Sequence, residues 1–322
     1  MAPQCKLSPR RVSEIAHAIH PATLITKFIL RDPQTVLPAG SMHFLEALLT
    51  RAKKRSPRLV ALCAPLLLAF ACGKPAPASS LKTAATSQEI YDGFEAKSLS
   101  DVWLTTKVEK DAVVLQSEIV RSGSGAAKIT LRQGDRREAA SAGSLENERD
   151  ELVERKDLYS PEDIGYSYAF SVFIPQDFPI VSTRLILAQL KQSDSGGAAK
   201  SDNPLIALRY VGGELSVSTQ HDDKKITRYK TKEDIRGQWL DFVIHVKFSR
   251  TPGGFVRVSM NGHELFHYTG VTAYDEAGGY AKNSLFYFKM GLYRDRMPES
   301  MTAYFDEYRK HPLSAAELGE HP

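Results

Sequence analysis

The sequence predicts an all-β fold in which two antiparallel sheets pack into a sandwich. From about Glu89 onward, short runs of alternating apolar and polar residues are separated by clusters of Gly, Pro, Asp and Asn. No internal repeat and no alternation of strands with long helical segments is visible, which argues against a parallel-sheet enzyme. A hydrophobic content of 42% and a charged content of 25% are typical of a globular chain with a sizeable core.

The chain after residue 89 contains eleven runs with the length and composition of β-strands. They are rich in β-branched and aromatic residues, and most end at a turn-forming residue. In chain order they cover 126–132, 151–157, 166–175, 184–192, 205–211, 214–220, 239–249, 255–262, 263–270, 285–294 and 301–310.

Side chains alternate between the two faces of a strand, so each run separates into a core set and an opposite set. In the run 285–294 the apolar set must face the core, which leaves the other set on the opposite face. The same reasoning divides 184–192. The predicted core residues are Phe286, Phe288, Met290, Leu292, Ile186, Ala188 and Leu190, and the opposite set contains Tyr287, Lys289, Gly291, Tyr293, Gln189 and Lys191.

The first 88 residues predict export. A basic stretch at 51–58 precedes an apolar run at 59–72, which is too short to span a bilayer and is typical of a signal peptide. Cys72 and the Gly/Pro/Ala/Ser-rich segment after it resemble a bacterial lipobox with imperfect positions. We expect 1–41 to be a non-native extension or mis-assigned start, 42–72 the signal peptide, 73–88 a flexible tether, 89–312 the folded domain and 313–322 a tail.

Two localisations follow from the signal. The protein is expected to be a periplasmic or outer-membrane lipoprotein, bound to the membrane through an acylated Cys72, or a secreted protein. All three cysteines lie at or before Cys72, so the folded domain has no disulfide framework. We expect a monomer.

Charge is distributed unevenly along the chain. Residues 1–72 carry ten Lys/Arg against three Asp/Glu, so the remainder carries 32 Lys/Arg against 35 Asp/Glu. A nucleic-acid partner would normally need a basic stripe on the folded domain, and none appears in this sequence. The acidic balance also weighs against a densely sulfated ligand.

The ordered motifs of the domain resemble the glucuronan lyase and heparin lyase I group of polysaccharide lyases. The resemblance covers about residues 89 to 310 and rests on pieces that arrive in the group's order. They are DGFE with Trp103, GAAKITLRQGD, an R-x-E pair, SYAFSVFIPQDFP, ILAQ, GQWLDFVIHVKFS, a V-x-V-x-x-NG turn, YFKMGLYR and AYFDEYRK. It implies a β-jelly-roll, concanavalin A-like sandwich and cleavage of uronic-acid-containing glycans by β-elimination.

The same resemblance assigns roles to individual residues. Lys289 and Tyr293 match the group's K-x-x-x-Y, and Gln189 matches the first residue of its Q-x-H motif, whose histidine is replaced here by Lys191. A tyrosine can act as both base and acid if nearby cations stabilise its phenolate. The expected catalytic residues are therefore Tyr293, Lys289 and Lys191, and the expected substrate-binding residues are Arg149, Gln189, Glu151, His245, Arg294 and Tyr287.

Other readings stay open at this point. The domain could be a carbohydrate-binding module without catalysis, since the sandwich alone does not fix function and the usual histidine is absent. A glycoside hydrolase is less favoured because no strand carries the required pair of carboxylates. His263 and His267 are expected at the surface, and His221, in a polar turn beside Asp222 and Asp223, is a weaker candidate for a base or metal ligand. No cofactor and no metal motif is found, although Asp306 with Glu307, or Asp92 with Glu95, could hold a structural Ca²⁺.

Overall fold

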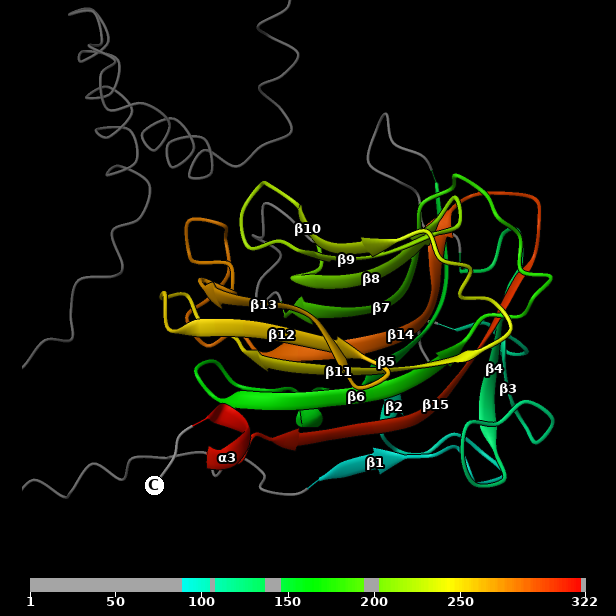
Figure 1. The fold of residues 1–322 in the computed structure, drawn as a ribbon, viewed down its shortest axis with the longest axis horizontal. Helices are drawn as coiled ribbons and strands as arrows, with labels where there is room; N and C mark the ends of the chain where they lie inside the picture. The colour runs from blue at the N-terminus through cyan, green and yellow to red at the C-terminus, as the bar shows by residue number, and fades with distance from the viewer. Residues whose placement is uncertain (1–88, 105–107, 137–145, 194–202, 320–322) are drawn as a thin grey trace, which may run out of the picture. The chain divides into compact units, whose positions relative to one another are not determined.

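The computed structural model describes residues 89–104, 108–136, 146–193 and 203–319. The predictions for 1–41, 42–72 and 73–88, including the lipidation of Cys72, lie outside these residues. Within the described part the chain forms two antiparallel sheets (Figure 1), which confirms the predicted jelly-roll sandwich. Its helices are the short η3 (Lys156–Leu158) and α3 (Ala315–Leu318), and α3 lies inside the expected tail. No described helix is long and apolar enough to cross a membrane.

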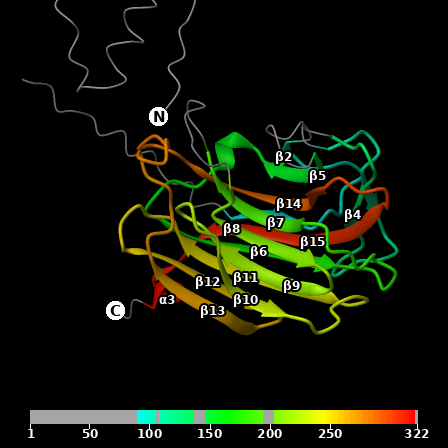
Figure 2. The same cartoon turned by 90° about the horizontal axis from the view of Figure 1, so that it is seen from above.

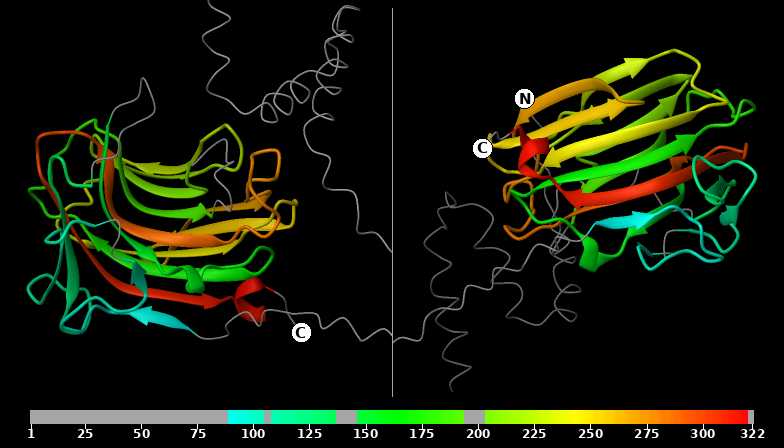
Figure 3. Two further views of the ribbon diagram at one scale, coloured as in Figure 1. Left: turned by 180° about the vertical axis from the view of Figure 1, so that it is seen from behind. Right: turned by 60° about the horizontal axis from the view of Figure 1, so that its bottom comes forward.

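One sheet has eight strands in the order β13-β12-β11-β6-β15-β4-β3, with β1 paired to β15. Figure 3 shows its strands and the helix α3 that follows β15. The strands are β1 (Ile90–Asp92), β3 (Val113–Gln116), β4 (Ala126–Leu131), β6 (Gly165–Phe173), β11 (Trp239–Lys247), β12 (Gly254–Met260), β13 (His263–Gly270) and β15 (Met301–Pro312).

The other sheet has seven strands in the order β10-β9-β8-β7-β14-β5-β2. Figure 2 shows the two sheets from above, with β14 between β7 and β5. Its strands are β2 (Trp103–Leu104), β5 (Asn147–Glu154), β7 (Leu185–Gln192), β8 (Ile206–Val211), β9 (Glu214–Thr219), β10 (Ile226–Thr231) and β14 (Phe286–Asp295). The sequence analysis did not predict β1, β2, β3 and β10, because these strands are short or show little alternation of apolar and polar residues.

The core lies between the sheets and is built by strand alternation. The predicted core residues of β14, Phe286, Phe288, Met290 and Leu292, are all fully buried. Aromatic rings join the sheets, with the Phe288 ring centroid 5.1 Å from that of Phe170 on β6. Burying one such side chain stabilises the fold by roughly 1.5 to 3 kcal/mol. The inward residues therefore fix which side chains of β14 remain on the outer face.

Two bulges shift the strand pairing in the seven-stranded sheet. The pairing of β14 with β7 shifts between Met290 and Tyr293, where Gly291 has φ 138° and a Cβ would lie 2.3 Å from the carbonyl oxygen of Asp150. Only glycine fits such a position. Figure 1 shows that β14 bends strongly along its length.

The second bulge corrects one prediction. The pairing of β7 with β8 shifts between Ile186 and Ala188. Ile186 is buried, yet it lies outside the inter-sheet core and lines the pocket on the outer face. The prediction that Ile186 packs in the core beside Ala188 and Leu190 is therefore wrong, because strict alternation does not hold across a bulge.

Candidate functional site

A pocket of about 630 Å³ opens on the outer face of the seven-stranded sheet. It gathers side chains from β5, β7, β8 and β14 and from the segments that connect these strands. Among the described lining residues, five are cationic and two are carboxylates, so the pocket carries an excess of positive charge. The cations are Arg149, Arg184, Lys191, Arg209 and Lys225, the carboxylates are Asp223 and Asp295, and the neutral polar groups include Gln189, Asn203, Gln220, Ser182 and Tyr293.

Tyr293 is a half-buried residue of β14 that lines this pocket. Two guanidinium groups lie over its ring: the Cζ of Arg149 is 4.3 Å and the Cζ of Arg184 is 4.6 Å from the ring centroid. Arg149 reaches this position because it stands directly opposite Tyr293 in the pairing of β5 with β14. A cation above an aromatic ring is attracted to its electron-rich face, and it also stabilises negative charge on the phenol oxygen.

Arg184 is fixed in place by its neighbours. Its Nε and Nη2 donate to Asp295 Oδ1 at 2.9 and 2.6 Å, and Nη2 also donates to Asn147. Burial lowers the pKa of Arg184, but hydrogen bonds with Asp295 and Tyr293 outweigh it and hold the pKa above its usual value. This arginine is therefore a permanent cation held against the tyrosine.

Glu151 contacts three other residues expected at the site. It is buried, and Gln189 Nε2 donates to its Oε1. Its Oε2 lies 3.7 Å from both Arg149 Nη1 and Lys289 Nζ. Lys289 and Lys191 were the two cations considered for Tyr293, and the structure pairs Lys289 with Glu151. The cations at the tyrosine are Arg149 and Arg184 instead.

Lys191 and Tyr287 stand opposite each other in the pairing of β7 with β14. Lys191 is buried and lines the pocket beside Gln189. The ring of Tyr287 stacks on that of Tyr159, with centroids 4.6 Å apart and an interplanar angle of 12°. Burial raises the pKa of Tyr159 to about 12, so it remains a neutral phenol at neutral pH. This stacked pair adds aromatic surface next to the cationic pocket.

The structure does not bring Arg294 or His245 to the pocket. Arg294 is fully buried on the inward face and forms an ion pair of 2.9 Å with Glu148, which excludes the expected contact with substrate. His245 lies on β11 of the other sheet, where burial lowers its pKa. The alternation argument applied to β14 already separates Arg294 from Tyr293, since neighbouring residues face opposite ways.

Three cations of the pocket were missed by the sequence analysis. Arg209 is the one charged side chain of β8, and in 205–211 it alternates with apolar and aromatic residues that face inward. That pattern could have identified it. Arg184 precedes β7 and Lys225 precedes β10, and no local signal places these connecting segments at the pocket.

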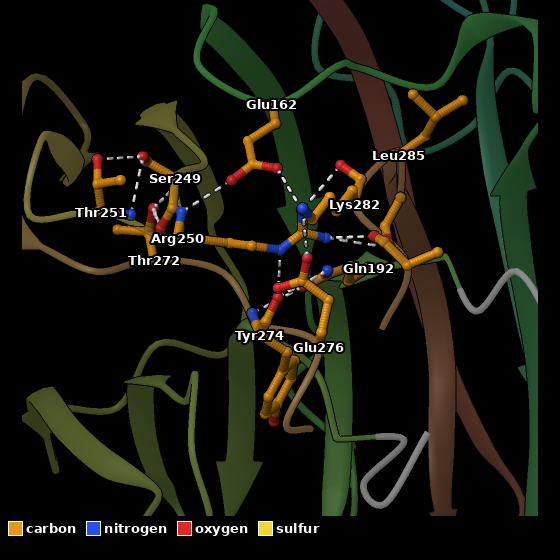
Figure 4. A network of polar contacts seen from close by, with 12 residues as sticks. Glu162, Gln192, Ser249, Arg250, Thr251, Thr272, Tyr274, Glu276, Lys282 and Leu285 are labelled. Atoms are coloured by element: carbon orange, nitrogen blue, oxygen red, sulfur yellow. Dashed lines mark hydrogen bonds and ion pairs between the residues drawn. The ribbon is translucent and has the colours of Figure 1, made fainter. Parts of the chain in front are cut away.

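The segment that leads into β14 is anchored by Arg250, as Figure 4 shows. Its Nη1 donates to Glu162 Oε2 at 2.8 Å and its Nε donates to the carbonyl oxygen of Tyr274 at 2.9 Å. Gln192, the last residue of β7, both donates to and accepts from the Tyr274 backbone. These bonds hold the entry to β14 and so help to position Tyr287 and the residues after it.

The residues do not fit the structural Ca²⁺ considered from the sequence. The Asp92 carboxylate accepts hydrogen bonds from the Phe94 amide, Ser100 and Trp103. The Asp306 carboxylate likewise accepts from backbone amides, including that of Arg121. Within the described ranges no group of three or more His, Cys, Asp or Glu residues is placed to hold a metal ion.

Comparisons with known proteins place this geometry in context. Residues 88–309 match the family model described as polysaccharide lyase. The endo-β-1,4-glucuronan lyase of the fungus Trichoderma reesei has a similar fold: the TM-score is 0.54 at 17% identity, over 71% of this chain and 97% of that one. An alginate lyase from Pseudomonas aeruginosa gives a TM-score of 0.43 at 19% identity, over 64% and 87%. No curated protein matches the chain.

Proposed function

Because this chain belongs to the polysaccharide lyase family, we propose that it cleaves a uronic-acid-containing glycan by β-elimination in the outer-face pocket. The observation that carries the proposal is the position of Tyr293, a phenol between two guanidinium groups in a pocket with excess positive charge. An acidic sugar would be attracted to such a pocket, and a phenolate formed there would be stabilised.

The reaction requires the carboxylate of the uronate to be neutralised first. Removing the proton at C5 places negative charge beside the carboxylate, so donors aimed at that group lower the barrier. Arg149, Gln189 and Lys191 are pocket residues of the right chemistry, and Glu151 orients the first two. We assign carboxylate binding to these three side chains.

Tyr293 then serves as base and acid in turn. Its phenolate takes the C5 proton, the electron pair forms the C4–C5 double bond, and the C4–O bond breaks. The phenol returns its proton to the leaving oxygen, which restores the phenolate. Arg149 and Arg184 over the ring stabilise the anionic form through the cycle. No other base is needed, which accounts for a lysine at 191 where relatives carry a histidine.

The substrate ranked first is a glucuronan-like or alginate-like polyuronate. The residues after 72 carry a slight acidic excess, which weighs against a densely sulfated chain. The fungal protein of similar fold is a glucuronan lyase, and almost its full length is covered. These two observations support polymers whose negative charge comes from carboxylates alone.

The test is an ultraviolet assay for the unsaturated product. Purified protein is mixed separately with glucuronan, alginate, hyaluronan and heparin, and absorbance is followed over time. The proposal predicts a rise with glucuronan or alginate. No rise with any of the four glycans at high protein concentration would contradict it.

One observation favours a second candidate, a carbohydrate-binding module. The described lining of the pocket contains no histidine, and Lys191 stands where some relatives use a histidine as the base. This candidate predicts that the protein binds glucuronan or alginate in calorimetry while the absorbance stays flat.

A further inference from the structure

A single cross-strand row links Tyr293 to Arg209. In the pairing of β14 with β7, Tyr293 stands opposite Ile186, and in the pairing of β7 with β8, Ile186 stands opposite Arg209. All three side chains line the pocket. Two inter-strand spacings of about 4.8 Å place the backbones of Tyr293 and Arg209 about 10 Å apart. The row therefore has the phenol of Tyr293 at one end, the guanidinium of Arg209 at the other and the apolar Ile186 between them.

Arg209 differs from the other arginines of the pocket in its partners. Its Nη1 donates to the Ser218 hydroxyl at 2.9 Å, and it forms no ion pair with any carboxylate in the described part of the chain. Arg149 and Arg184, in contrast, lie against Glu151 and Asp295. A half-buried guanidinium without a counter-charge is costly unless an anion joins it.

The electrostatic environment of Arg209 also favours the binding of an anion. Burial, together with the charge of Arg184, lowers the pKa of Arg209 to about 10. The group is still fully charged at neutral pH, so the two arginines repel each other in the free protein. An anion bound between or beside them would relieve that repulsion.

We propose that Arg209 binds a second carboxylate of the glycan, distinct from the one neutralised beside Tyr293. This inference rests on the proposed function and narrows it, because a glycan with a single isolated uronate can fill only one of the two sites. The preferred substrate class is a glycan with repeated carboxylates.

The test compares Arg209→Gln with the matched control Arg228→Gln. Arg228 belongs to β10 of the same sheet, but its guanidinium lies over the ring of Tyr268, 4.0 Å from the centroid, and it does not line the pocket. Binding of a β-1,4-linked glucuronate tetramer and of methyl glucuronide is measured by calorimetry. All variants carry Tyr293→Phe so that no turnover interferes.

Arg209→Gln is expected to weaken binding of the tetramer about tenfold or more and to leave the affinity for the monosaccharide unchanged. Arg228→Gln should change neither, and Arg209→Lys should retain most of the tetramer affinity because it keeps the charge. Equal tetramer binding by Arg209→Gln and the parent, or an equal loss for both ligands, overturns the inference. Circular dichroism verifies that each variant is folded.

The lyase proposal and the proposal for Arg209 can be refuted independently of each other. If the wild-type protein cleaves none of the glycans, the lyase proposal fails, while the calorimetry still decides whether Arg209 is a carboxylate site. If cleavage occurs and Arg209→Gln leaves tetramer binding intact, the second site is wrong and the lyase proposal stands.

Discussion

The buried ion pair behind the pocket allows a quantitative prediction. Glu148 and Arg294 are both fully buried and stand opposite each other in the pairing of β5 with β14, one residue from the pair Arg149 and Tyr293. Arg294 Nε and Nη2 donate to Glu148 Oε2 at 3.0 and 2.9 Å. Replacing Glu148 by Gln keeps the shape but leaves the guanidinium without its counter-charge.

Breaking a buried pair in this way costs about 3 to 5 kcal/mol of unfolding free energy. For a domain of this size, each kcal/mol lowers the melting temperature by about 2 to 4 °C, so Glu148→Gln should melt about 6 to 20 °C below the wild type. The control is Glu146→Gln, whose partner Arg296 lies 2.8 Å away in a partly exposed pair just beyond the ends of the same two strands.

The measurement is thermal unfolding followed by near-ultraviolet circular dichroism. Glu146→Gln should shift the midpoint by no more than about 4 °C, because exposed pairs contribute about 0 to 1 kcal/mol. Equal midpoints for Glu148→Gln and the wild type would refute the structural role given to Arg294, and would return it to consideration as a substrate contact.

Three further predictions concern charge. Arg184→Gln should lower kcat at least tenfold in the product assay with the fold retained, because it removes one cation from Tyr293; an unchanged kcat contradicts this role. Burial raises the pKa of Asp150 to about 8, so wild-type stability should fall as pH rises from about 4 to 8. Urea denaturation should show a smaller fall for Asp150→Asn than for the wild type, and an equal fall in both proteins would refute this role of Asp150. Raising NaCl from 0.05 to 0.5 M should increase KM, as screening weakens attraction to the cationic pocket, and a salt-independent KM argues against it.

Much of the fold follows from local pattern. Alternation identified the inward face of β14 because each second residue is a large apolar side chain, and it placed Tyr293, Lys289 and Tyr287 together on the other face. It failed at Ile186, where a bulge moves one residue to the opposite side. A bulge depends on the partner strand, so a single run of residues does not reveal it.

The sequence likewise predicted part of the site, namely several of the residues that line it, but not how their charges pair. The motif residues Arg149, Gln189, Lys191 and Tyr293 do line one pocket. The ion pair of Lys289 with Glu151 was not predicted, since spacing along one strand says nothing about Glu151 on the adjacent strand. The partner of each charge is decided by cross-strand pairing and by connecting segments, which no local pattern encodes.

The central claim is that the phenol of Tyr293 carries the proton in a cationic pocket. The most direct measurement is the rate of unsaturated product formation by Tyr293→Phe, with Tyr159→Phe as the control, because Tyr159 stacks on Tyr287 and does not line the pocket. We predict that Tyr293→Phe loses at least about a thousandfold in kcat while glycan binding is retained, and that Tyr159→Phe stays within about tenfold of the wild type. Wild-type turnover by Tyr293→Phe would contradict the claim.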